Sequence, residues 1–216
     1  MGLVNELQEA AERDDVLTVL RKAKRVSAKL GRKDICLWLE HEQNGYPDGN
    51  VVPEYRLVPV TFCYNTNGYI PAGYGQLING IVPLPGIVGG CKSPIYQPIS
   101  TVLDWVESMK SGHGIYEPIP PKVAETLRGG LRCNMPELLH HVTFMAQLDS
   151  SEVRAIPEHI KNRVLDWACD LETAGVTGEG QSFSENEKRT AQTVIFNINN
   201  SNIDQLNNSG SNIKGS

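Results

Sequence analysis

The chain has 216 residues, of which 40% are hydrophobic and 21% charged, and its formal net charge is −5. A chain of this length can bury roughly 70% of its surface, so a core can form without disulfides or metals. This composition excludes a disordered chain, and no apolar run approaches the roughly 18 residues of a membrane span. The polar, acidic start of the sequence is unlike a signal peptide. We therefore expect a cytoplasmic protein without membrane contact.

The cysteines agree with this location. They are odd in number, widely separated and without a CxxC pair, which disfavours both a disulfide framework and a zinc site. We expect reduced thiols at Cys36, Cys63, Cys91, Cys133 and Cys169.

Three helices are predicted before residue 46. Apolar residues recur at spacings of three and four in two stretches, 3–11 and 16–30, which is typical of amphipathic helices. One of the two aspartates at 14–15 can cap the second helix, and Gly31 can end it. A third short helix is predicted over 35–45, where an Asn-Gly pair ends it.

A small antiparallel sheet is predicted after these helices. Pro and Gly become frequent between Tyr46 and Ser100, and β-favouring stretches occupy 56–64, 76–84 and 87–91. The Asn-Thr-Asn-Gly sequence at 65–68 is a turn signal.

The next elements alternate between helix and strand. A helix is predicted to begin at Ser100 or Thr101 and to end at Gly112, and 117–121 must be extended because of its prolines. The alternation over 139–148 predicts a strand. A long amphipathic helix follows, with Pro157 in its first turn and Gly175 after its end.

The C-terminal sequence has a different composition. Gly175 to Gly180 resembles a hinge, and residues 193–216 contain seven Asn and four Ser. Ser201-Asn202-Ile203 recurs as Ser211-Asn212-Ile213. Regular apolar residues with Asn at bends are typical of a β-arch or a narrow solenoid, because stacked Asn side chains form hydrogen-bonded ladders. The alternative is a disordered polar tail.

The fold prediction is therefore α+β. It comprises N-terminal helices, a small central antiparallel sheet, a C-terminal amphipathic helix and an Asn-rich tail like a β-arch or solenoid. The predicted divisions are a globular domain over 1–174, a linker over 175–192 and the β-repetitive tail over 193–216.

One stretch of the second predicted helix and its end is rich in cations. Charges at helical spacing usually form a solvated face, so the stretch favours nucleic-acid binding only weakly, and we expect these side chains to face water. They are Arg21, Lys22, Lys24, Arg25, Lys29, Arg32 and Lys33.

The motifs of common catalytic sites are incomplete. Gly86 to Ser93 resembles a phosphate loop, but Cys91 precedes Lys92 where Gly is required, and Pro94 follows where a helix should begin. His140 and His141 would point to opposite faces of a strand and cannot share a metal without a bulge. No GxSxG or HExxH motif is present.

Two charged pairs have structural interpretations. Glu54 and Arg56 flank Tyr55 in a strand-like segment, so they could share one face. Arg163 and Asp166 are three residues apart on the last helix and can pair at its surface. We expect both pairs to stabilise the fold.

Several segments together resemble the AbiTii domain of bacterial abortive-infection proteins, over roughly residues 3–174. Their order and spacing carry the resemblance, and members often continue into a Gly/Asn-rich β-repetitive segment like this tail. The resemblance implies a cytoplasmic bacterial protein of phage defence and brings no catalytic residues. The segments are Leu3–Leu7, Trp38–Glu40, Glu42–Tyr46, Val52–Arg56, Ile160–Trp167 and Leu171–Glu172.

Two functions remain open. The first is a non-enzymatic component of an abortive-infection system that acts by protein–protein interaction and self-assembles through its tail. The second is a toxin-like enzyme acting on nucleic acid or nucleotides. We favour the first, with a homo-oligomer, a phage or defence-system protein as possible partner, and no cofactor, metal or assigned catalytic residue. The predicted oligomerisation residues are Phe196, Ile198, Ile203, Leu206 and Ile213.

Overall fold

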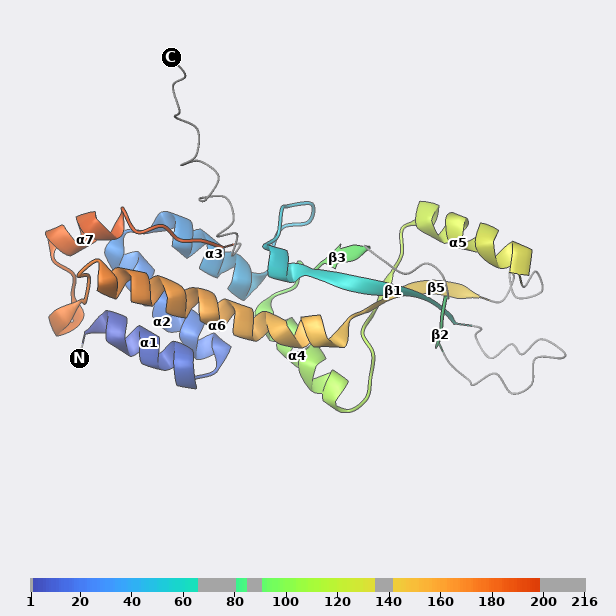
Figure 1. Cartoon of the computed structure of the whole chain (residues 1–216), viewed down its shortest axis with the longest axis horizontal. Helices are drawn as coiled ribbons and strands as arrows, with labels where there is room; N and C mark the ends of the chain where they lie inside the picture. The colour runs from blue at the N-terminus through green and yellow to red at the C-terminus, as the bar shows by residue number, and fades with distance from the viewer. Residues whose placement is uncertain (1, 66–80, 85–90, 135–141, 199–216) are drawn as a thin grey trace, which may run out of the picture. The chain divides into compact units, whose positions relative to one another are not determined.

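The computed structural model describes residues 2–65, 81–84, 91–134 and 142–198 (Figure 1). The fold is α+β, as predicted, because helices and one antiparallel sheet make up the described elements. Contacts divide the chain into two units. The first contains Met1–Tyr55, Tyr96–Ser100 and Ile156–Ser216, and the second contains Arg56–Ile95 and Thr101–Ala155.

The first unit is helical. Helix α2 packs against α1, α3 and α7, and the Gln8 side chain of α1 donates a 2.8 Å hydrogen bond to Glu172 of α6. The apolar faces of these helices form the core, where Leu7, Leu20 and Leu39 are completely buried. The elements are α1 (Leu3–Arg13), α2 (Val16–Leu30), α3 (Lys33–Asn44), the later part of α6 (Ser150–Thr173), η3 (Glu179–Gln181) and α7 (Glu185–Ala191).

The ends of α2 follow the sequence signals. The carboxylate of Asp15 accepts a 3.0 Å hydrogen bond from the Thr18 N–H, which satisfies a donor of the first turn. Gly31 follows the last turn with φ of 73°, a left-handed conformation that glycine adopts without strain. The prediction that Asp14 or Asp15 caps this helix and that Gly31 ends it is confirmed.

The second unit contains the sheet. The strand order is β2-β1-β5-β4, with β3 paired to the other end of β1, and every pair is antiparallel. Helix α5 and most of α4 belong to this unit. The elements are β1 (Leu57–Asn65), β2 (Ile81–Pro83), β3 (Lys92–Pro94), α4 (Ile99–Lys110), β4 (Tyr116–Pro118), α5 (Pro121–Asn134) and β5 (Thr143–Leu148).

The central strand pair builds the core of this unit. The register of β1 and β5 places Phe62 opposite Ala146 and Tyr64 opposite Phe144. Because alternate residues share a face, these four side chains lie together, and Leu127 of α5 packs against them. The predicted strands at 56–64 and 139–148 correspond to β1 and β5.

Helix α5 was not predicted. Two adjacent glycines, Gly129 and Gly130, lower the helix propensity of its sequence. Ala124 and Leu127 nevertheless lie three residues apart on one face and are buried in the core of the sheet unit. Tertiary packing therefore outweighs local propensity here.

Helix α6 begins earlier than predicted. Pro157 lies inside the helix and not in its first turn, because the helix starts at Ser150. The carboxylate of Asp149 accepts hydrogen bonds from the N–H groups of Ser151 and Glu152, at 2.9 and 3.2 Å, and so caps the true N-terminus. An Asp-Ser-Ser-Glu sequence marks this start. The prediction missed it because proline is usually found in the first turn of a helix, which favoured a start near Pro157.

The C-terminal region contains further local structure. Within the range predicted as a linker, 175–192, the structure has η3 and α7. Residues 193–198 contain turns and bends without a strand, while the rest of the predicted β-repetitive tail lies outside the described residues. The predicted turn at 65–68 and most of the predicted strands at 76–84 and 87–91 also lie outside them.

None of the helices in the described ranges combines the length and apolar character that crossing a bilayer requires.

Candidate functional site

A C-terminal strap, residues 192–198, follows α7 and is fixed to the first unit by a buried arginine. Arg32 is only 5% exposed, and its Nη1 donates 2.7 Å hydrogen bonds to the main-chain oxygens of Ala191 and Val194. Its Nε and Nη2 donate to the two carboxylate oxygens of Asp34, at 2.9 and 2.7 Å. These side-chain hydrogen bonds lower the pKa of Asp34. The carboxylate of Asp34 thus balances the charge of the Arg32 guanidinium, which at the same time binds the strap backbone.

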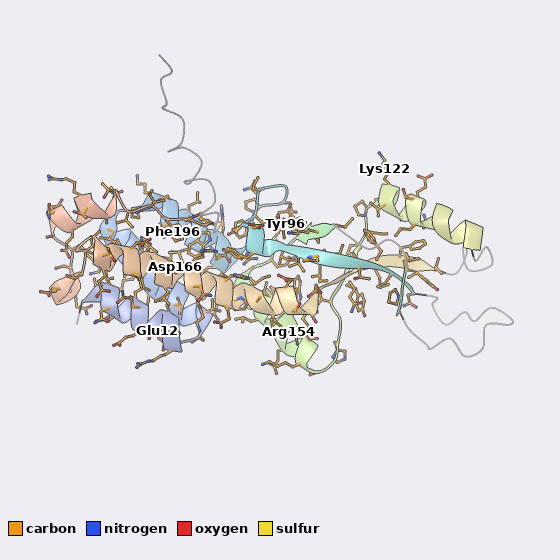
Figure 2. The ribbon with its side chains drawn as sticks, viewed as in Figure 1. Glu12, Tyr96, Lys122, Arg154, Asp166 and Phe196 are labelled. Carbon is orange, nitrogen blue, oxygen red and sulfur yellow. The ribbon has the colours of Figure 1, made fainter. Side chains whose placement is uncertain are left out.

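An aromatic contact anchors the strap further along. The ring of Phe196 lies with its centroid 4.9 Å from Trp38 of α3 and 6.2 Å from Trp167 of α6. The labelled Phe196 and Asp166 lie in the same part of this unit (Figure 2). Tilted and edge-on pairs at these distances are favourable beyond the apolar area they bury. Phe196, a predicted oligomerisation residue, therefore contacts its own chain.

An apolar hollow lies where the described strap ends. Its volume is about 270 Å³, and Ile198 forms part of its wall. Leu37 and Val51 leave 54% and 93% of their surfaces exposed beside it. The other lining residues are Asp34, Trp38, His41, Tyr46, Val52 and Pro53.

A second, more polar hollow has Phe196 in its wall. Its volume is about 520 Å³, and its walls come from α6 and the strap. Arg163 and Asp166 pair there across 3.6 Å, which confirms their predicted pairing. The remaining lining residues are Trp167, Cys169, Asp170, Ile195, Phe196 and Asn197.

A buried carboxylate ties the segment before Tyr55 to α3. Glu42 has 0% exposure and accepts hydrogen bonds from the hydroxyls of Tyr46 and Tyr55, at 2.6 and 2.7 Å. Burial, and then the negative charge of Glu42, raise the pKa of Tyr55 well above its usual range, so its hydroxyl stays a donor. The indole of Trp38 donates to the same hydroxyl at 3.0 Å, and the ring of His159 stacks on Tyr55. Because no surface of Glu42 is accessible, this cluster stabilises the fold and offers no group to a substrate.

A second carboxylate holds the two ends of the unit together. Glu187 of α7 accepts hydrogen bonds from the N–H groups of Thr177, Gly178 and Ser184, at 3.0, 2.9 and 2.8 Å. Burial acts to raise the pKa of Glu187, but these hydrogen bonds outweigh it and lower the pKa to about 2. The carbonyls of Gly178 and Thr177 accept from the N–H groups of Leu3 and Val4. The first turn of α1 is therefore satisfied by the C-terminal region.

The cation-rich stretch of α2 serves internal contacts. Lys22 pairs with Asp14 at 2.9 Å, and both Arg25 and Lys29 donate to Gln181 of η3. The prediction that these cations face water is wrong for Arg32, because its side chain is buried and donates to the carbonyls of Ala191 at the end of α7 and Val194 of the strap.

The remaining sequence candidates do not form a reactive cluster in the described residues. His41 contacts the ring of Tyr46, while His140 and His141 lie outside the described residues. No group of three His, Cys, Asp or Glu side chains suited to a metal occurs in the described ranges. The cysteines described there, at positions 36, 63, 91 and 169, are free thiols.

The backbone at Lys92–Pro94 agrees with the rejection of a phosphate loop, and the backbone at Glu54–Arg56 corrects the predicted strand. Lys92–Pro94 forms strand β3, so the phosphate-loop-like sequence is not followed by the helix such a loop needs. Glu54–Arg56 forms a 3-10 helix and not a strand, because Arg56 turns inward, with 0% exposure, and donates to the Ile95 carbonyl at 3.0 Å. Glu54 is exposed, so the two charges do not share a face.

The residues that anchor the strap were not found from the sequence. Arg32 was grouped with surface cations, and neither Glu42 nor Glu187 stood out. The Ser-Glu-Asn-Glu sequence at 184–187 is a capping-box signal that could have identified Glu187. Of the predicted oligomerisation residues, Phe196 and Ile198 lie on the strap, and Ile203, Leu206 and Ile213 lie outside the described residues.

Comparison with known proteins identifies the family. The AbiTii family model matches residues 2–196, a range that runs from the start of α1 through α7 to Phe196 of the strap. Neither the curated proteins nor the solved structures contain a match. Since the family model matches most of the chain, this protein belongs to the AbiTii family.

Proposed function

We propose that this protein is a non-enzymatic component of a bacterial abortive-infection system, which acts through protein–protein contacts and self-assembles through its C-terminal tail. Membership of the AbiTii family supports the link to abortive infection. The anchored strap is the observation that carries the assembly part. Arg32 and Phe196 hold the chain to the folded unit almost to Ile198, so the Asn-rich sequence starts from a fixed point.

The energetics favour assembly of several copies over a simple pair. Ile203, Leu206 and Ile213 are spaced along a tail whose only charges after residue 198 are Asp204 and Lys214. At about 25 cal/mol per Å², burying these side chains contributes a few kcal/mol per copy before ordering entropy is subtracted. A stack of copies shares each ordered tail between two neighbours, so assembly should rise steeply with concentration.

A pair of matched variants tests the proposal. Changing Ile203 and Ile213 to Asp should abolish assembly and remove protection of cells against phage. The control changes the neighbouring Asn202 and Asn212 to Asp, which adds the same charges but keeps the apolar side chains. Light scattering behind size exclusion and plaque counts are measured for both. Assembly that survives the isoleucine changes would refute tail-mediated assembly.

The alternative, a toxin-like enzyme acting on nucleic acid or nucleotides, has a separate test. Five of the seven cations that motivate it have partners inside the first unit; they are Lys22, Lys24, Arg25, Lys29 and Arg32. Incubation of the full chain with RNA, DNA and nucleotides plus divalent metals should give no turnover. Turnover that one polar substitution removes would favour this alternative instead.

A further inference from the structure

We propose that the apolar hollow beside the strap holds the side chain of Ile203 from the same chain, with residues 199–202 forming the turn that returns the tail to the helical unit. The proposal goes beyond the assembly proposed above and does not depend on it. A docked Ile203 starts the tail on the helical unit and leaves Leu206 and Ile213 for contacts with other copies.

The hollow presents apolar surface to an incoming side chain. Leu37 and Val51 are exposed beside it, whereas Trp38 and Val52 of its lining are buried. Exposed apolar side chains that gather at one place mark an interaction surface, unlike single scattered ones. The volume of about 270 Å³ leaves room for one aliphatic side chain, since apolar cavities of roughly 150 Å³ already hold benzene.

The charges of the hollow and of the chain that leads from it are compatible with apolar docking. The carboxylate of Asp34, in the lining, accepts hydrogen bonds of 2.9 and 2.7 Å from Arg32, so its charge is balanced. No charged residue occurs from Thr190 to Ile203. Docking of this segment therefore buries no unpaired charge.

The last described residue of the strap lies in the wall of this hollow. Ile198 is half-buried there, and the contact of Phe196 with Trp38 fixes the strap two residues earlier. The next four residues are Asn-Asn-Ser-Asn, which are types that favour turns, and four-residue loops commonly join antiparallel segments. Ile203 is the first apolar residue after Ile198, so a reversal over 199–202 brings it back beside the hollow.

The same chain is a better occupant of the hollow than a second copy. A specific interface between two molecules buries roughly 1,200 Å² or more, and one isoleucine side chain supplies only a small part of that area. A segment tethered by a short flexible linker has an effective concentration in the millimolar range. A weak apolar contact is therefore populated within one chain at concentrations where it is not populated between two.

Contacts of Ile203 in the full chain test the proposal. Ile, Leu and Val methyl groups are isotopically labelled, and nuclear Overhauser contacts from Ile203 to Leu37 and Val51 are measured at a concentration where light scattering reports one chain. Val51→Asp puts a charge beside the hollow, at a position whose 93% exposure makes the change tolerable for the fold. Asn50→Asp is the matched control, because it adds the same charge at the neighbouring exposed residue, which does not line the hollow.

The wild type should show contacts from Ile203 to both Leu37 and Val51 within the single chain. In Val51→Asp the contact with Leu37 should weaken at least threefold, and in Asn50→Asp it should be unchanged. Absence of both contacts from the single chain would overturn the proposal. Contacts seen only between chains, in a mixture of labelled and unlabelled protein, would also overturn it, because a second copy would then fill the hollow. A wild type that keeps the contacts but never assembles would support docking and refute tail assembly alone.

Discussion

The guanidinium of Arg32 donates a 2.7 Å hydrogen bond to the main-chain oxygen of Val194, 162 residues later in the chain. The same nitrogen donates to the Ala191 carbonyl, and Gln192 donates back to the Leu30 carbonyl at 2.9 Å. The end of α2 and the strap are thus joined in both directions. Because a buried guanidinium without partners is costly, Arg32 couples the position of the strap to the stability of the helical unit.

Replacing Arg32 should therefore weaken the whole unit. Arg32→Ala leaves the carbonyls of Ala191 and Val194 without their charged donor, and the expected loss is about 3 kcal/mol in the free energy of unfolding. Urea denaturation followed by circular dichroism measures it. Arg21→Ala is the control, because Arg21 is exposed on the same helix, and it should change stability by less than about 0.5 kcal/mol. Equal effects would contradict the anchoring role.

Phe196 should report on docking of the strap through tryptophan emission. Phe196→Ala removes the ring that contacts Trp38 and Trp167, so water reaches both indoles and their emission should shift to longer wavelength. The expected destabilisation is about 2 kcal/mol, since the ring is only half-buried. Ile195→Ala, on the exposed side of the strap, should leave the emission unchanged. An unchanged spectrum for Phe196→Ala would show that the strap does not dock there in solution.

Glu187 should make stability depend on acid pH. Its pKa is about 2 in the folded chain and near 4.5 when unfolded. A depressed folded pKa stabilises the protein above pH 4.5, and this contribution disappears as the pH falls from about 4.5 to 2. Glu187→Gln should cost about 2 kcal/mol at pH 7, after allowance for solvent screening. The wild-type and variant stabilities, measured by urea titration at several pH values, should converge near pH 2. A difference in unfolding free energy between the two proteins that does not change with pH would show that the charge of Glu187 does not stabilise the fold.

Two glycines should respond to alanine in opposite directions. A Cβ on Gly2 would clash with the Thr177 carbonyl oxygen, so Gly2→Ala must displace the backbone that caps α1 and should cost about 1–3 kcal/mol. At Gly129, inside α5, a Cβ meets nothing within 4 Å among the described residues. Gly129→Ala should stabilise by about 0.5–1 kcal/mol, because alanine loses less backbone entropy in a helix. Thermal unfolding of both variants tests the pair.

The first helices could be predicted because their signals are local. Apolar residues from Leu3 to Leu30 repeat at helical spacing, and Asp15 and Gly31 mark the ends of α2 through their own side chain or backbone. Helix α5 and the start of α6 depend instead on burial against the sheet and on a cap that a proline obscured. Those contacts join residues far apart in sequence, which periodicity does not register.

The strap site likewise combines local sequence signals with contacts between residues far apart in the sequence. The apolar residue Phe196 was predicted from the sequence to contact other copies of the chain. In the structure its ring contacts Trp38 and Trp167 of its own chain. Arg32 is one of seven nearby cations, and only the return of the chain at Ala191 distinguishes it from the others. Likewise, Glu42 lies in a polar stretch of α3, and its burial follows from two tyrosines at positions 46 and 55.

Sedimentation velocity of the full chain over a wide concentration range tests most directly whether this AbiTii protein assembles through its C-terminal residues. With tail assembly, the average mass should rise steeply from the 23.8 kDa of one chain towards large species, and the Ile203→Asp, Ile213→Asp variant should stay at one chain. A wild-type mass that remains at one chain over the whole range would contradict it.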